Sequence, residues 1–170
     1  MSQEDSKSEN KGAPAGARRL ARLAAVQALY QIEVNGGEPA RVVREFLDHR
    51  LAEAIDGFSL EGLDREFFGA LVTGAATDAA ELDEVITPAL VQGWPLNRLE
   101  SLIRLILRCG AFELWQRPDI PARVVINEYL EVAHAFYEDK EPAFVNGVLD
   151  RLAKSLRDAE LGAAGTPGEG

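Results

Sequence analysis

Apolar residues recur at steps of three and four through most of this 170-residue chain, which is the spacing of an amphipathic α-helix. The segment from Asn97 to Gln116 is apolar around most of a helical circumference, so we expect it to form the central, most buried helix. The chain has no long alternating run of β-branched residues and no Asn-Gly turn between two such runs. The sequence therefore predicts an all-α fold, a two-lobed helical bundle of six to seven helices.

Glycine and proline mark the ends of the expected helices. Gly36-Gly37 stops the first helix, and Pro39 suits a first helical position. A bend is expected at Gly74, and segment 55–62, which contains glycine and serine, is expected to be a loop. The expected helices cover residues 17–34, 38–51, 63–86, 97–116, 122–136 and 142–157.

The two ends of the chain contain few residues that could be buried. Residues 1–16 and 158–170 are therefore expected to be a disordered leader and a disordered tail. The folded domain is expected to cover residues 17–157, with one lobe at about 17–92 and a second lobe at about 97–157.

Charge is distributed unevenly along the chain. The 18 basic and 28 acidic residues give a net charge of −10, which argues against a nucleic acid partner if only the whole molecule is considered. A nucleic acid responds to the local field, however. Residues 11–31 contain four basic residues, Lys11 among them, and no acidic one, and a second series of arginines lies at 98–117. This asymmetry is the first indication of function.

Composition and motifs exclude several classes of protein. The single cysteine, Cys109, rules out an intramolecular disulfide framework, and we expect it to be a small packed hydrophobe. The polar N-terminal segment is not a secretory signal, and no apolar run reaches the ~20 residues that span a bilayer. A cytoplasmic protein that does not contact membranes is expected. Trp94 and Trp115 are expected in the core or at the junction of the lobes.

No enzyme signature is found. The chain lacks a phosphate-binding loop, a dinucleotide fingerprint and a nucleophile elbow. Glu131 and His134 have the Glu-x-x-His spacing of di-iron helical bundles, but the second half of such a site is missing. We therefore expect no metal, no cofactor and no catalytic residue.

The arginines allow two interpretations. Arg18, Arg19 and Arg22 cluster on one side of the first expected helix, and Arg104 and Arg108 lie one turn apart on the central one. Guanidinium groups bind phosphates and base edges well, but arginines also extend from solvated helix faces. The residues alone favour RNA binding and a solvated face about equally.

Five segments together resemble the NusB family. The chain reads ARRLARLAAVQALYQ at 17–31 and RLILRCGAFEL at 104–114, followed by DIP at 119–121, VINE at 125–128 and FVNGVLD at 144–150. They occur in the family's order and at nearly its spacing, and the resemblance covers Ala17 to Ser155. It implies an all-helical factor of transcription antitermination and ribosomal RNA synthesis that is not an enzyme. Such factors bind the single-stranded boxA element of nascent RNA together with ribosomal protein NusE, within the RNA polymerase antitermination complex.

The resemblance also implies roles for individual residues. Phe144 is implied to stack on a base, although a core position is the alternative, and Tyr30 is implied to lie on the NusE side. Asp139 matches an acidic residue of the preceding turn, for which Glu141 is a competing match. Leu20 stands where many members have another arginine. The implied RNA-binding residues are Arg18, Arg19, Arg22, Arg104, Arg108, Asp139 and Phe144.

Two other functions stay open. One is a structural helical homodimer whose interface covers the RNA surface. The other is a NusB-like accessory domain used in ribosomal RNA modification.

Overall fold

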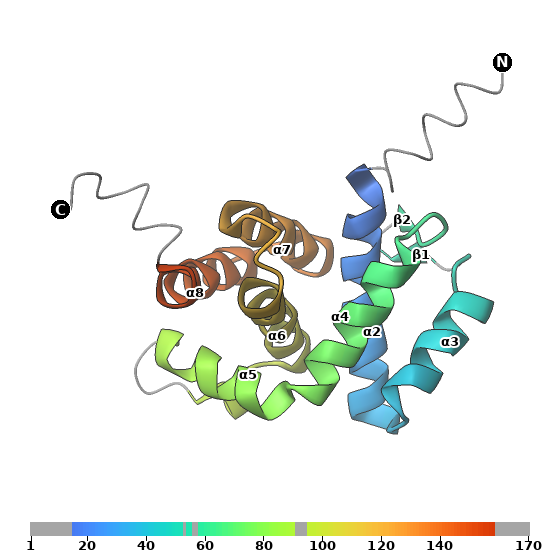
Figure 1. The fold of residues 1–170 in the computed structure, drawn as a ribbon, viewed down its shortest axis with the longest axis horizontal. Helices are drawn as coiled ribbons and strands as arrows, with labels where there is room; N and C mark the ends of the chain where they lie inside the picture. The colour runs from blue at the N-terminus through green and yellow to red at the C-terminus, as the bar shows by residue number, and fades with distance from the viewer. Residues whose placement is uncertain (1–14, 53, 56–57, 91–94, 159–170) are drawn as a thin grey trace, which may run out of the picture. The chain divides into compact units, whose positions relative to one another are not determined.

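The computed structural model describes residues 15–52, 54–55, 58–90 and 95–158, and most of them are helical. This confirms the all-α prediction. The predicted leader and tail lie outside the described residues over 1–14 and 159–170, as do Lys11 and Trp94. The α-helices are α2 (Ala15–Asn35), α3 (Pro39–His49), α4 (Arg65–Thr77), α5 (Ala79–Ile86), α6 (Ser101–Gln116), α7 (Ala122–Phe136) and α8 (Glu141–Leu156) (Figure 1). Two single 3₁₀ turns are η1 (Thr87–Ala89) and η2 (Leu96–Arg98).

Two helix boundaries differ from the prediction. The expected bend at Gly74 lies instead at Asp78, whose backbone (φ −96°, ψ 19°) separates α4 from α5. The expected helix 97–116 is interrupted because Leu99 and Glu100 are extended, with ψ of 149° and 146°, so that α6 begins only at Ser101. This interruption places Leu99 and Glu100 at the amino end of α6, outside the helix.

A short pair of strands occurs where only a loop was expected. β1 (Ala54–Ile55) pairs antiparallel with β2 (Phe58–Ser59), with Ala54 opposite Ser59 and Ile55 opposite Phe58. Two residues on each side are too few to produce an alternating sequence pattern, so the periodicity of the sequence could not reveal them.

The chain forms two compact units, residues 1–72 and 73–170, which divide within α4. The predicted lobes divided instead between residues 92 and 97. In the first unit α2 contacts α3, and the rings of Phe46 on α3 and Phe68 on α4 lie 5.6 Å apart between centroids.

The second unit is built around α6. This helix contacts α5, α7 and α8, and most of its length is buried, which confirms its predicted central place within this unit. Gly110 allows the close approach of α8, because a Cβ there would lie 2.9 Å from a methyl group of Leu149. Residue Cys109 is fully buried, as expected of a packed hydrophobe.

Arg157 closes the carboxyl end of α6. Its side chain is buried, and it donates hydrogen bonds to the backbone carbonyls of Leu114 (2.6 Å) and Arg117 (2.9 Å). The Leu114 carbonyl is one of the last four of α6, which lack partners within the helix, so Arg157 satisfies it. The Arg117 carbonyl also accepts a hydrogen bond from the backbone N–H of Ile120, at 3.0 Å.

The lengths and compositions of the helices also bear on membranes. Within the described residues, no helix is long and apolar enough to cross a membrane.

Candidate functional site

The three arginines of α2 differ in accessibility. The Arg18 side chain is 44% exposed, and its Nε lies 3.7 Å from Oδ2 of Asp64. Arg19 is exposed, whereas Arg22 is only 3% exposed. The guanidinium carbons of Arg18 and Arg22 lie 4.7 and 4.9 Å from the centroid of the Phe67 ring, at distances typical of cation–π contacts.

The three arginines predicted to cluster on one side of α2 are therefore not equally accessible. Residues four apart share a helix face, and Phe67 of α4 packs against the face that carries Arg18 and Arg22. Only Arg18 and Arg19 present substantial surface to solvent.

Tyr30 lies further along α2 and is 39% exposed. Val34, one turn later, is 60% exposed. We call these two residues the α2 apolar pair. Two large apolar side chains adjacent on one helix face form a small surface to which a protein partner could bind.

The two arginines of α6 contact other groups of the second unit. Arg108 donates from Nε and Nη2 to the two carboxylate oxygens of Asp83 on α5, at 2.8 and 2.9 Å. Arg104 is half-buried and donates from Nη2 to the Ser101 hydroxyl at 3.2 Å. The sequence did not indicate Asp83 as a partner, because the ion pair depends on how α5 packs on α6.

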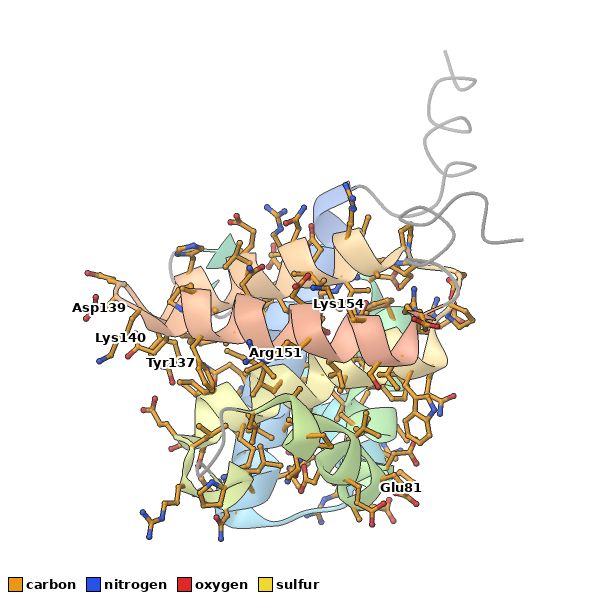
Figure 2. All side chains as sticks on the ribbon, turned by 90° about the vertical axis from the view of Figure 1, so that its left-hand side faces the viewer. Glu81, Tyr137, Asp139, Lys140, Arg151 and Lys154 are labelled. Carbon is orange, nitrogen blue, oxygen red and sulfur yellow. The ribbon has the colours of Figure 1, made fainter. Side chains whose placement is uncertain are left out.

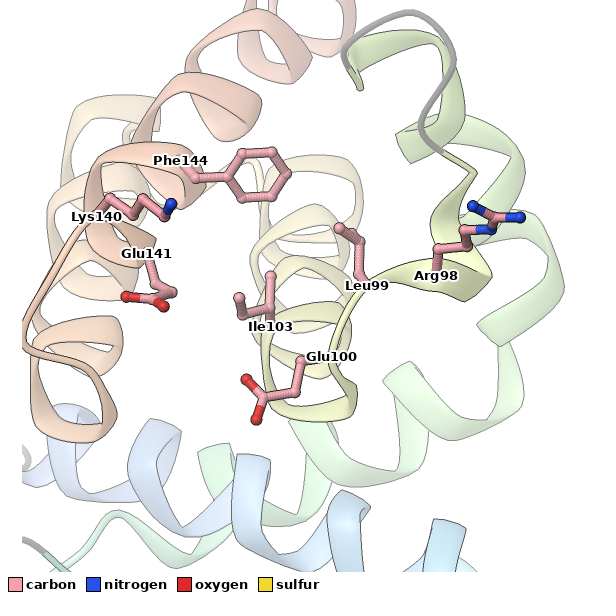
Figure 3. Close-up of a pocket in the computed structure, with 7 residues that line it drawn as sticks. All are labelled: Arg98, Leu99, Glu100, Ile103, Lys140, Glu141 and Phe144. Atoms are coloured by element: carbon pink, nitrogen blue, oxygen red, sulfur yellow. The ribbon is translucent and has the colours of Figure 1, made fainter.

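A pocket of about 440 Å³ lies between the amino ends of α6 and α8 (Figure 3). Phe144, in the first turns of α8, is half-buried and directs its ring into this hollow, where Leu99 and Ile103 form the facing apolar wall (Figure 3). The other residues that line the pocket are charged: Arg98, Glu100, Lys140 and Glu141.

Tyr137 fixes one of these charged groups. Its hydroxyl donates a hydrogen bond to Oε1 of Glu100. Burial, and then the hydrogen bond and charge of Glu100, raise the pKa of Tyr137 well above its ordinary value. The hydroxyl therefore stays protonated and remains a donor at physiological pH.

The two acidic residues that competed for the turn before α8 lie in different places. Asp139 is exposed, and with Lys140 it projects from the turn (Figure 2). Glu141 begins α8 and lines the pocket beside Phe144. The carboxylate of Glu141 also lies where the helix dipole favours a negative charge.

The sequence also singled out residues that do not line the pocket. Trp115 is 39% exposed near the end of α6, so it does not lie in the core, and a place at the junction of the lobes stays a prediction. Glu131 and His134 are both exposed on α7.

Some residues of the pocket were not predicted as site residues. The sequence indicated Leu99 and Ile103 only as apolar residues of an expected helix. Nothing in it indicated that the side chains of Tyr137 and Glu100 would form a hydrogen bond.

Comparisons with known proteins agree on one family. The NusB family pattern matches residues 19–154. The transcription antitermination protein NusB of Caulobacter vibrioides is 48% identical over 141 residues, which are 83% of this chain and 95% of that protein. The protein of the same name from Sinorhizobium fredii is 48% identical over 143 residues, 84% of this chain and 89% of its own length.

Solved structures give the same result. T. maritima NusB superposes with a TM-score of 0.67 at 32% identity, covering 81% of this chain and 90% of that one. A structure of the antitermination factors NusB and NusE in complex with double-stranded RNA also gives a TM-score of 0.67, at 26% identity, covering 84% and 99%. The match over residues 19–154 and the near 50% identity to full-length relatives show that the chain belongs to the NusB family.

Proposed function

We propose that this chain is an RNA-binding transcription antitermination factor that recognises the boxA element of nascent ribosomal RNA. It acts together with ribosomal protein NusE, in the antitermination complex of RNA polymerase. The names of its relatives support the antitermination role. A related NusB has been solved with NusE and RNA, which supports the two partners.

The half-buried ring of Phe144, which faces the pocket, is the observation that carries the proposal. A phenylalanine that served only the core would be enclosed by apolar side chains, whereas this ring faces a hollow with cationic side chains at its edge. Single-stranded RNA readers combine an aromatic platform with cations that track the backbone. Phe144 would stack on a base while Arg98 and Lys140 attract phosphates.

The other predicted RNA-binding residues differ in how they would take part in RNA binding. Arg18 and Arg19 are accessible and would contact phosphates, whereas Arg22 mainly packs on Phe67. Arg104 and Arg108 would contribute from α6, with Arg108 shared between RNA and Asp83. Asp139 projects into solvent and would accept hydrogen bonds from bases or sugars.

NusE is proposed to bind the α2 apolar pair, Tyr30 and Val34. Their exposure leaves apolar surface that a protein partner can bury. Tyrosine is common at such interfaces because its ring is apolar and its hydroxyl can stay in water.

A titration of labelled RNA tests the proposal. BoxA RNA and a scrambled RNA of the same composition are each added to the full chain, with and without purified NusE. We expect boxA to bind more tightly than the scrambled RNA, and NusE to increase its affinity through reciprocal coupling. Equal affinity for the two RNAs would overturn sequence recognition, and an affinity unchanged by NusE would overturn joint binding.

A further inference from the structure

Glu100 is an unexpected group in a pocket that is proposed to bind a polyanion. It lines the same hollow as Phe144, with the apolar side chains of Leu99 and Ile103 beside it (Figure 3). It precedes α6 as the N-cap residue, but its side chain makes no capping hydrogen bond. A capping hydrogen bond therefore does not account for a carboxylate at this place.

Tyr137 holds the Glu100 carboxylate in one orientation. The hydroxyl of Tyr137 occupies Oε1, so the second oxygen, Oε2, is left to face other groups. An ionised carboxylate only accepts hydrogen bonds. Any ligand group that it contacts must therefore be a donor, which excludes phosphate oxygens.

We propose that Glu100 reads a base: its carboxylate accepts a hydrogen bond from the exocyclic amine of a cytosine or adenine that lies against Phe144, and it disfavours uracil. This inference rests on the proposed function, since it assigns the base class that the Phe144 pocket takes.

The chemistry of the bases supports the assignment. Cytosine and adenine carry an amine donor on the edge that a stacked base offers to its surroundings, and carboxylates accept from the cytosine N4 amine. Uracil has a carbonyl oxygen in place of that amine, which a carboxylate repels. The cations Arg98 and Lys140 line the same pocket and can attract the phosphates that Glu100 repels.

Glu141 is the other carboxylate that lines the pocket. It lies in the first turn of α8, where the helix dipole stabilises its charge. Glu100 precedes α6 as its N-cap residue, where the dipole likewise favours a negative charge, but it differs from Glu141 in that the Tyr137 hydroxyl orients its carboxylate. We therefore assign base reading to Glu100, with Tyr137 as its positioning residue.

The test uses RNA decamers that differ at one base. The probes are a uridine decamer, the same decamer with one central cytidine, and a third with pyrimidin-2-one at that position, which is cytosine without its amine. We expect the full chain to bind the cytidine decamer at least about fivefold more tightly than the other two. Equal affinities for cytidine and pyrimidin-2-one would overturn the proposal.

Two variants locate the effect. In Glu100→Gln the amide oxygen can accept the hydrogen bond from the Tyr137 hydroxyl. The amide nitrogen then faces the base as a hydrogen-bond donor, which matches the carbonyl oxygen of uracil. We expect this variant to lose or reverse the preference for cytidine. In Tyr137→Phe the preference weakens, because the carboxylate is no longer oriented. A preference that persists unchanged in Glu100→Gln would overturn the role of Glu100.

Glu138→Gln is the matched control, since it removes one negative charge from an exposed residue of the turn before α8. It should keep the preference for cytidine, and a loss as large as that of Glu100→Gln would overturn the assignment. If the wild-type chain binds none of the decamers and no boxA RNA, the proposed function fails as well. Binding of boxA RNA without any preference for the amine overturns only this inference.

Discussion

Arg108 and Asp83 form a two-point ion pair between α6 and α5, with Nε–Oδ1 at 2.8 Å and Nη2–Oδ2 at 2.9 Å. Their side chains are 17% and 33% exposed. The same guanidinium is proposed to meet RNA. In that proposal Asp83 would compete with phosphate for Arg108, because both ligands use the same paired donors.

This competition predicts opposite effects on stability and on binding. Asp83→Asn should lower the free energy of unfolding by about 1–2 kcal/mol, a value between those of exposed and buried pairs. It should also raise the affinity for boxA RNA, because the released guanidinium can bind phosphate. Urea unfolding and RNA titration measure the two effects.

Arg108→Ala is the control background for this prediction. Asp83→Asn should change RNA affinity little when Arg108 is absent. An equal gain in the presence and absence of Arg108 would mean that Asp83 acts only through the net charge of the protein.

Substitutions of the α2 arginines should affect either RNA binding or stability, depending on the residue. Arg19→Ala should reduce the salt dependence of RNA binding by about 0.7 in slope, the value for one phosphate contact with a single strand. Arg22→Ala should leave that slope unchanged and lower the free energy of unfolding by about 1–2 kcal/mol, because it removes a buried cation from the Phe67 ring. Binding measured at several salt concentrations, together with thermal unfolding, tests both. A flattened slope for Arg22→Ala would assign it to the RNA surface.

The sequence predicted helices well where local signals bound them. The predicted and observed bounds of α7 agree because Pro121 precedes the helix and its apolar stripe is regular. Membership of the NusB family confirms that the chain is not an enzyme. That recognition depended on motifs such as FVNGVLD, whereas the arginines alone left RNA binding and a solvated face equally favoured.

Contacts between distant segments could not be predicted. Asp83 and Arg108 are 25 residues apart, and no local pattern relates them. A helical wheel places Arg22 on a face of α2 but does not show that Phe67 covers this face. The pocket likewise depends on the extended backbone at Leu99 and Glu100, which the continuous apolar pattern of 97–116 concealed.

Gly74 should tolerate no side chain, although it lies within a helix. A Cβ there would lie 2.2 Å from the ring of Phe112. Gly74→Ala should therefore lower the free energy of unfolding by about 1–3 kcal/mol through overpacking, even though alanine favours helix formation. Thermal or urea unfolding measures the change.

Gly69 provides the control in the same helix. A Cβ at this position would meet only a methyl group of Val43, at 3.7 Å, so Gly69→Ala should leave stability unchanged or raise it by up to about 1 kcal/mol. Destabilisation by both substitutions to the same extent would show that the Phe112 contact is not the cause.

Substitution of Phe144 distinguishes stacking on RNA from packing in the core. Its half-buried ring faces a pocket, so Phe144→Ala should weaken boxA binding by roughly 1–3 kcal/mol, the range measured for base stacking on aromatic side chains. The melting temperature should fall only slightly. A core residue would behave in the opposite way and cost about 3–5 kcal/mol of folding free energy.

Phe144→Tyr is the matched variant for this last test. It keeps the ring, and its hydroxyl can stay in water, so affinity for boxA RNA should stay close to that of the wild type. Val145→Ala, one residue later at a fully buried position, should lower stability without changing the affinity of the folded protein. RNA titration and thermal unfolding of the three variants measure both properties. If Phe144→Ala behaves like Val145→Ala, the ring belongs to the core, and the binding site would have to rest on the arginines.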